Sequence, residues 1–310
     1  HWKVYTFSTP VRRSNKVSKH KIGSNLRILK VTKLSTNCDV YDLTVDTYHN
    51  CIANGIVVHN CGEQPLLPYE SCNLGSINLA RFVSKGDFLE DGFVHTVECA
   101  VRFLDAVIDK NNYPLEIIRE RTLATRKIGL GIMGWADTII LMGIPYCSED
   151  AIDLMDHIGE LLRTTARIAS EELGRHLGYF SAPSHLRRRN ANLLTIAPTG
   201  SLHKLAQCSS SIEPIYEWVT TYHIEAGTYT VQHPLYEIAS ANGLIKDTAH
   251  NIPWLWQLKH QSVWQSYIDN GVSKTINLPE DCSVDMIEEI FRKAKEMRCK
   301  GVTMYRDRSK

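Results

Sequence analysis

The sequence predicts an α/β protein preceded by a small all-β segment. Beyond residue 61, amphipathic helical stretches alternate with short apolar runs typical of buried strands. Residues 38–60 instead consist of short strand-like runs, and residues 6–33 are basic, rich in Ser and Asn, and lack helical periodicity. We therefore place a domain boundary between residues 60 and 61, which separates residues 1–60 from residues 61–310.

Two features indicate strands in the first domain. Residues 40–46 alternate apolar and polar side chains with period two over most of their length. Asn54-Gly55 separates the apolar residues 51–53 from residues 56–58, which is a strong signal for a two-residue β-hairpin.

Four of the helices predicted in the second domain have an apolar face or a helix-start signal. Residues 91–112 place apolar side chains on one face, and Pro114 is a favourable start for a second helix. Residues 148–174 form an amphipathic stretch with Ser148 as N-cap and a glycine as stop, and residues 283–299 form another capped helix.

Three further segments are apolar. Residues 128–143 contain several glycines, and we expect a closely packed buried helix there. Residues 193–196 are expected to be a buried strand that leads directly into the turn at residues 198–201. Residues 301–305 are expected to be the final strand.

Composition excludes several classes of function. The 310 residues carry a net charge of +1, which gives no reason to expect nucleic acid or a membrane surface as a partner. No apolar run reaches bilayer length. The nine cysteines are scattered, which favours a reducing cytoplasm, and without a Cys-x-x-Cys pair we expect no metal site. The first residue is His1 rather than Met, so we expect a fragment of a longer reading frame.

His59, Asn60 and Cys61 supply the parts of a self-cleaving junction in order. An Asn side-chain amide can attack its own main-chain carbonyl and break the following peptide bond. An adjacent histidine can donate a proton to that carbonyl, and the next thiol can accept an acyl group. The tripeptide alone is a weak signal, because it often arises by chance.

The surrounding residues 40–60 strengthen this interpretation, because they closely resemble the C-terminal blocks of inteins. By matching positions, Asp42 and His49 would be auxiliary acid/base groups and Asn60 the cyclising residue. No N-terminal nucleophile or upstream histidine block precedes Val40, so residues 1–60 would be the C-terminal part of an intein of all-β, Hint-type fold. Splicing would then need an N-terminal half as a partner.

Cys61 also begins a second motif. On a strand, Cys61 and Glu63 place their side chains on the same face. A thiol beside a carboxylate suits a reaction that removes a hydrogen atom from one carbon while a base takes a hydroxyl proton. Spacing alone does not distinguish this from a buried Cys next to an exposed Glu.

A longer pattern resembles ribonucleotide reductases. Residues 61–79 (CGEQPLLPYESCNLGSINL) are similar to the finger strand of the adenosylcobalamin-dependent class. Further motifs follow in the family's order at residues 126–134, 196–201 with 211–214, 273–279 and 299–303. The resemblance implies the C-terminal portion of a ten-stranded α/β barrel, with Cys61 on a central finger loop.

The resemblance also implies residue roles. Cys61 would carry the transient thiyl radical, and Glu63 would be the base at the ribose 3′ hydroxyl. Cys72 would be one of two thiols that deliver reducing equivalents and end as a disulfide, its partner lying upstream in the family. Thr199, Gly200 and Ser201 would cradle the substrate phosphates.

Near the predicted phosphate-binding turn, two residues depart from the family's pattern, and one basic segment has two possible interpretations. His203 replaces the family's usual serine, and Ser211 replaces its usual glycine, where a side chain would perturb a tight turn. The basic residues 187–189 could attract phosphates, although we expect them to be a solvated loop.

The implied activity is reduction of ribonucleotides, with diphosphates as the expected substrate, to deoxyribonucleotides for DNA synthesis. The implied cofactor is adenosylcobalamin, bound mainly by the complete enzyme, and the reductant is an external dithiol such as thioredoxin. A homodimer is left open. Two alternatives remain: a cobalamin-independent reductase large subunit, and an autoprocessing intein fragment whose downstream half is inactive.

Overall fold

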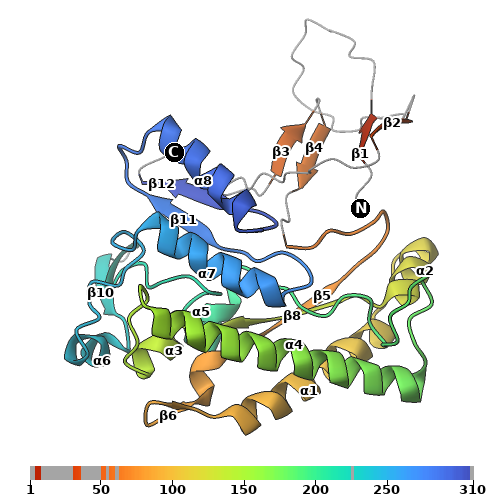
Figure 1. Cartoon of the computed structure of the whole chain (residues 1–310), viewed down its shortest axis with the longest axis horizontal. Coiled ribbons are helices and arrows are strands. Elements are labelled where there is room, and N and C mark those ends of the chain that lie inside the picture. Colours follow the sequence, from red (N-terminus) through yellow and green to blue (C-terminus); the bar gives the residue numbers. More distant parts are fainter. Residues whose placement is uncertain are drawn as a thin grey trace, which may run out of the picture. The chain divides into compact units, whose positions relative to one another are not determined.

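The chain divides into two compact units, His1–Cys61 and Gly62–Lys310, and each is described by itself. The computed structural model (Figure 1) describes residues 4–7, 31–35, 50–53, 56–59, 63–224 and 227–307.

The described part of the first unit contains two antiparallel strand pairs. Strand β1 (Val4–Phe7) pairs with β2 (Val31–Ser35), and β3 (Asn50–Ala53) pairs with β4 (Ile56–His59). In the second pair Ala53 lies opposite Ile56, so the predicted hairpin across residues 54 and 55 is confirmed. The strand predicted at residues 40–46 lies outside the described residues.

Parallel pairing runs through the second unit. Strand β5 (Asn73–Asn78) pairs with β8 (Ile128–Met133), and β11 (Thr275–Leu278) pairs with β12 (Thr303–Arg306). Between these pairs, residues 193–196 bridge β8 through Leu194 and bridge Val272, just before β11, through Ile196. The predicted α/β class and the extended segment at residues 193–196 are thus confirmed, while the ten-stranded barrel remains an expectation.

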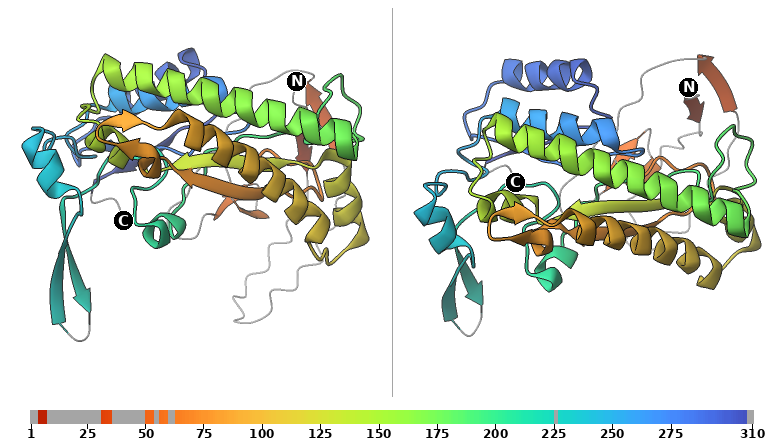
Figure 2. Two further views of the ribbon diagram at one scale, coloured as in Figure 1. Left: turned by 90° about the horizontal axis from the view of Figure 1, so that it is seen from below. Right: turned by 60° about the horizontal axis from the view of Figure 1, so that its bottom comes forward.

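Three long helices pack side by side along these strands: α1 (Glu90–Lys110), α4 (Glu149–Leu177) and α7 (Trp254–Tyr267) (Figure 2). Helix α1 buries an apolar stripe at helical spacing, as predicted for residues 91–112. The predicted cap of α4 is confirmed, because the Ser148 hydroxyl accepts the Ala151 N–H at 3.1 Å.

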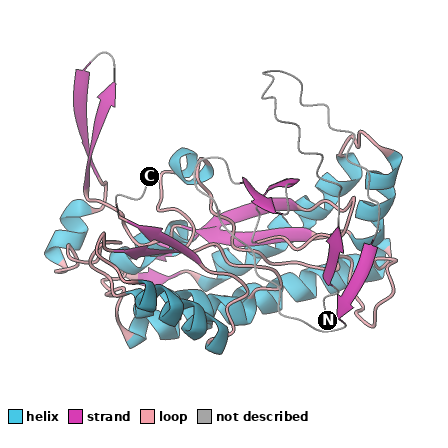
Figure 3. Ribbon diagram, turned by 90° about the horizontal axis from the view of Figure 1, so that it is seen from above, coloured by secondary structure: helices cyan, strands magenta, loops and turns pink. Residues whose placement is uncertain are grey.

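Shorter elements complete the unit (Figure 3): η1 (Leu79–Phe82), β6 (Val83–Ser84), β7 (Asp87–Phe88), α2 (Glu116–Thr125), α3 (Trp135–Leu141), α5 (Leu202–Ala206), β9 (Val219–Ile224), β10 (Gly227–Gln232), α6 (Tyr236–Ala241) and α8 (Val284–Glu296). Strands β9 and β10 form an antiparallel hairpin that projects from the rest of the unit (Figure 3). Helix α8 confirms the capped helix predicted at residues 283–299, with Ser283 as its N-cap.

The helix predicted over residues 128–143 is wrong. This segment forms strand β8, turns at Gly134 with φ of 78°, and only then continues as α3. A continuous apolar run does not by itself distinguish a buried strand from a buried helix. Gly131 marks the difference, since a Cβ there would lie 1.9 Å from the Thr195 carbonyl oxygen on the neighbouring strand.

Candidate functional site

The main chain of Glu63 is hydrogen-bonded to two segments that are distant in sequence. Its carbonyl oxygen accepts the Gly271 N–H at 2.9 Å and the Thr195 hydroxyl at 3.3 Å. The side-chain amide of the next residue, Gln64, donates to the same Thr195 hydroxyl. The half-buried Glu63 is therefore held beside the strand at residues 193–196, on one side of β8.

Cys72 lies on the other side of β8, immediately before β5. It is half-buried, and its thiol contacts the Asn73 carbonyl oxygen at 3.7 Å. A cavity of about 140 Å³ opens beside it. Its lining residues come from the start of β5, from α1 and α2 and from the loop between these helices: Ser71, Cys72, Asn73, Val107, Ile108, Asn111, Tyr113 and Thr122.

The turn predicted to hold phosphates is closed by its own side chains. Thr199 is buried and has φ of 53°, and its hydroxyl accepts the Ser211 N–H at 2.9 Å. Its carbonyl oxygen accepts the N–H of His203 at 2.9 Å and contacts the His203 ring Nδ1 at 2.8 Å. Gly200 and Ser201 are exposed, so these two residues present polar groups to solvent.

Ser211 occupies the left-handed backbone region with φ of 47°. Glycine is favoured there because it has no Cβ, so the serine carries local strain. Its hydroxyl donates to the Ser273 carbonyl oxygen at 3.3 Å, which ties the end of the turn to the segment that leads into β11. The side chain of Ser211 was expected to perturb a tight turn. The structure accommodates it in a strained backbone conformation, which its hydrogen bond to Ser273 holds in place.

A buried acid supports the same turn from α3. The Asp137 carboxylate accepts the Ser209 N–H at 2.7 Å, and its other oxygen lies 3.6 Å from His233 Nε2. Burial raises the pKa of Asp137 to about 6, against the opposing effect of the Ser209 hydrogen bonds. Burial also lowers the pKa of His233.

Glu213, two residues beyond Ser211, is half-buried and forms an ion pair with the buried Lys274. Its carboxylate accepts the Lys274 ammonium at 2.7 Å and the Thr275 N–H at 2.6 Å. The Lys274 side chain is fully buried, and this burial lowers its pKa while the Glu213 carboxylate opposes the shift. The pair connects the end of the turn to the start of β11.

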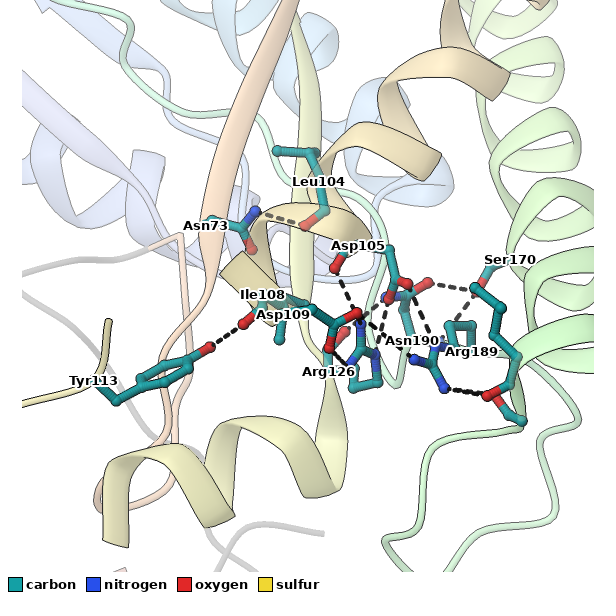
Figure 4. Close-up of polar contacts among 12 residues, drawn as sticks. Asn73, Leu104, Asp105, Ile108, Asp109, Tyr113, Arg126, Ser170, Arg189 and Asn190 are labelled. Atoms are coloured by element: carbon teal, nitrogen blue, oxygen red, sulfur yellow. Dashed lines mark hydrogen bonds and ion pairs between the residues drawn. The ribbon is translucent and has the colours of Figure 1, made fainter. Parts of the chain in front are cut away.

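The solvated loop expected at residues 187–189 is wrong for two of its three arginines. Arg189 donates to Asp105 at 3.3 Å and to the carbonyl oxygens that end α4, and Arg188 donates to the Ala191 carbonyl at 2.6 Å. Figure 4 shows Arg189 in a network with Arg126 and Asp105. Arg189 thus neutralises the buried Asp105 carboxylate, and Arg188 holds the main chain at Ala191, so both are structural.

Several predicted site residues lie outside the described residues, namely Asp42, His49, Asn60 and Cys61, and of His59 only the backbone is described, as the end of β4. Among residues 63–224 and 227–307, no cluster of histidine, cysteine and acidic side chains suited to a metal ion occurs. None of the helices described is long and apolar enough to cross a bilayer.

Comparison with known proteins decides the family. A family model described as the ribonucleotide reductase barrel domain matches residues 10–185 and 187–305. The chain belongs to the ribonucleotide reductase family. The match begins inside residues 1–60, and the comparisons do not show the predicted intein.

Several of the named relatives are vitamin B12-dependent reductases. The vitamin B12-dependent ribonucleoside-diphosphate reductase of Thermoplasma acidophilum is 40% identical over 286 residues, covering 81% of this chain and 37% of the relative. That of Mycobacterium tuberculosis (strain ATCC 25618 / H37Rv) is 36% identical over 280 residues, covering 79% and 40%. The chain thus spans about two fifths of the length of these relatives.

A solved reductase has the same fold. The alpha subunit of the class Id ribonucleotide reductase of Actinobacillus ureae matches with a TM-score of 0.67 and 23% identity, covering 81% of this chain and 53% of that one. At this identity the likeness concerns the reductase fold alone.

Sequence reasoning missed several polar residues that hold the candidate site residues in place. Thr195, Asp137 and Lys274 lie in apolar stretches or in family motifs, and each meets a partner at least 61 residues away in sequence. The only signal was a polar residue inside a buried run, which normally needs a hydrogen-bond partner.

Proposed function

We propose that the complete protein reduces ribonucleoside diphosphates to deoxyribonucleotides by thiyl-radical chemistry. The observation that carries this proposal is the 40% identity to a reductase named for vitamin B12 and for diphosphate substrates. The anchoring of Glu63 to strand residue Thr195 and to Gly271 supports it, because a base must be held at a fixed place.

The proposed chemistry assigns one role to each residue. A thiyl radical on Cys61 takes the hydrogen atom from ribose C3′, and the Glu63 carboxylate takes the 3′-hydroxyl proton. The 2′ hydroxyl leaves as water. Cys72 and a second thiol, which lies upstream in the family, supply two electrons and two protons and end as a disulfide; one hydrogen is added at C2′ and one proton leaves in the water. Glu63 then returns its proton to the 3′ oxygen, and Cys61 returns its hydrogen atom to C3′, which regenerates the thiyl radical.

The turn at residues 198–201 is proposed to receive the substrate phosphates. Gly200 and Ser201 are exposed there and offer polar groups, whereas the buried Thr199 holds the turn closed. His203, whose ring Nδ1 contacts the Thr199 carbonyl oxygen, borders the same turn. The main-chain N–H groups of an exposed turn are suitable donors to phosphate oxygens.

We propose adenosylcobalamin as the cofactor of the complete enzyme, in keeping with the names of its relatives. The cavity of about 140 Å³ beside Cys72 is not proposed as its binding site. Other parts of the enzyme would hold the cofactor. An external dithiol such as thioredoxin, a cytoplasmic location and a homodimer belong to the same proposal.

The test uses the full-length enzyme with a ribonucleoside diphosphate and a dithiol. We expect deoxyribonucleotide formation that requires added adenosylcobalamin and is abolished by Glu63→Gln. Cys72→Ser should block turnover with thioredoxin. Activity without the cofactor would instead favour the cobalamin-independent large subunit.

Protein splicing is a second proposed activity. The hairpin β3–β4 ends at His59, and the first compact unit ends at Cys61, which supports residues 1–60 as the C-terminal part of an intein. In this proposal Asp42 and His49 assist, His59 polarises the carbonyl, Asn60 cyclises and Cys61 accepts the acyl group. An N-terminal intein half would be the partner.

Mass spectrometry of the incubated chain tests the splicing proposal. We expect release of residues 61–310 by cleavage after Asn60, and no release from the Asn60→Ala variant. Equal cleavage in both proteins would contradict it. Cleavage without any reductase activity in the full-length enzyme would favour the autoprocessing alternative.

A further inference from the structure

The hydroxyl of Thr195 links the segment of the proposed catalytic base, Glu63, to the strand at residues 193–196. We propose that Thr195 is a positioning residue of the reductase, whose hydroxyl fixes the segment of Glu63 and Gln64 so that the Glu63 carboxylate stays at the reacting sugar. This inference rests on the function proposed above, and adds to it a residue outside the motifs of the catalytic cysteines.

The Thr195 hydroxyl uses both its donor and its acceptor capacity on this segment. It donates to the Glu63 carbonyl oxygen at 3.3 Å and accepts from the Gln64 side-chain amide. These partners lie 132 and 131 residues away in sequence. One buried atom therefore closes a bridge to two consecutive residues, which restricts rotation of the Glu63 backbone.

The strand that carries Thr195 is itself immobilised on both sides. Leu194 and Ile196 form parallel bridges to β8 and to Val272. Thr195 is completely buried, and its own N–H donates to the Leu130 carbonyl oxygen at 3.0 Å. Through its hydroxyl, Thr195 therefore anchors the half-buried segment of Glu63 and Gln64 to an immobile strand.

Packing around Gln64 leaves room for its hydrogen bond to Thr195. A Cβ at Gly129 would lie 2.8 Å from the Gln64 amide nitrogen and 3.2 Å from the Thr195 Cβ, so the missing side chain makes room for the bridge. The Gln64 amide oxygen is buried and has no hydrogen-bond partner among the described residues. Its amide nitrogen, bound to Thr195, is therefore the end that orients this side chain.

Two substitutions separate the hydroxyl from the bulk of the side chain. Thr195→Val keeps the branched shape but removes the hydroxyl, and Thr195→Ser keeps the hydroxyl but removes a methyl group. Misplacement of a catalytic group by about 1 Å can cost on the order of 100-fold in rate. A role limited to packing would make serine the more damaging change.

The test is steady-state kinetics of the full-length reductase with adenosylcobalamin, a ribonucleoside diphosphate and a dithiol. We expect Thr195→Val to lower kcat by at least about tenfold, with KM within about threefold, and Thr195→Ser to stay within about threefold of wild type. Thr138→Val is the matched control, because Thr138 is equally buried and its hydroxyl donates to the carbonyl oxygen of Gly134, the N-cap of its own helix.

The outcomes distinguish this inference from the proposed function. A folded Thr195→Val enzyme with the kcat of Thr138→Val overturns the positioning role while leaving reductase activity intact. An inactive wild type, or a fully active Glu63→Gln variant, overturns the proposed function and this inference with it. If Thr195→Val does not fold, Gln64→Met tests the bridge from its other end, and an unchanged kcat there overturns the inference.

Discussion

The carboxylate of Asp137 accepts the main-chain N–H of Ser209 at 2.7 Å, across 72 residues of sequence. This contact holds the segment that follows α5 against the first turn of α3. The acid is only 4% exposed, so its ionised form loses most of its hydration.

We predict that this buried acid makes stability fall as pH rises from about 4 to 6. The folded pKa of about 6 lies above the usual 3.8, so in this interval the folded state binds a proton that the unfolded state has released. Relative to Asp137→Asn, wild type should lose up to about 3 kcal/mol of unfolding free energy between pH 4 and pH 7.

Chemical denaturation of wild type and Asp137→Asn at several pH values measures this difference. The contributions of all other titrating groups are common to both proteins and cancel when the two are subtracted. Asp153→Asn, at an exposed position on α4, is the control and should parallel wild type. Parallel pH profiles for wild type and Asp137→Asn would refute the prediction.

The Glu213–Lys274 pair predicts an asymmetric double-mutant cycle. Glu213→Gln leaves a charged lysine in a site with no exposure, which should cost about 3–5 kcal/mol of unfolding free energy. Lys274→Met should cost less, because the Glu213 side chain is 24% exposed and can still reach water. The double variant should be more stable than the sum of the two losses predicts, and strict additivity in urea unfolding would contradict a coupled pair.

His260 predicts a loss of stability in acid. Its ring is fully buried, stacks on Tyr146 at 3.7 Å, accepts the Trp135 indole N–H at 3.2 Å and contacts the Tyr146 carbonyl oxygen at 2.9 Å. Burial lowers its pKa to about 3, so its contribution is complete above pH 6.5 and declines as pH falls from 6.5 toward 3.

A variant removes this acid sensitivity. His260→Phe should be less stable at pH 7, because the Trp135 indole N–H loses its acceptor, but its stability should depend less on pH below 6.5. His157→Gln, at an exposed ion pair with Glu90, is the control. Equal slopes for wild type and His260→Phe in unfolding experiments would exclude this role.

Gly131 predicts a steric limit between two strands. Gly131→Ala would place a methyl group 1.9 Å from the Thr195 carbonyl oxygen, so the strands must separate and the variant should lose at least about 3 kcal/mol or fail to fold. Gly301→Ala has nothing within 4 Å and should stay within about 0.5 kcal/mol of wild type. A soluble Gly131→Ala protein with an unchanged melting temperature would show that this spacing is not required.

Local patterns predicted α1, α4 and α8, because each has an apolar stripe at helical spacing and two have a serine cap that acts within three residues. They failed at residues 128–143, where apolar residues on every face fit both a strand and a helix. The deciding contact, between Gly131 and Thr195, joins segments that the sequence does not show to be neighbours.

The candidate site was predictable only where its residues lie in motifs. Glu63, Cys72 and the turn at residues 198–201 were found in this way. Arg189 was misjudged because three adjacent arginines look solvated, while the carboxylate that holds it, Asp105, lies 84 residues earlier. Asp137 and Thr195 were missed for the same reason, since only the folded chain shows what faces a buried polar group.

The segment from Thr195 to Thr199 connects the residue that holds the Glu63 segment to the turn proposed to receive the substrate phosphates. The four Cα–Cα steps between these two residues span at most about 14 Å, which limits the distance between the Glu63 segment and the phosphate turn. Deletion of one of these residues would shorten this span by about 3.3 Å and rotate the following side chains to the opposite face. Natural variation in length should consequently accumulate in the projecting hairpin β9–β10 and be absent from this short spacer.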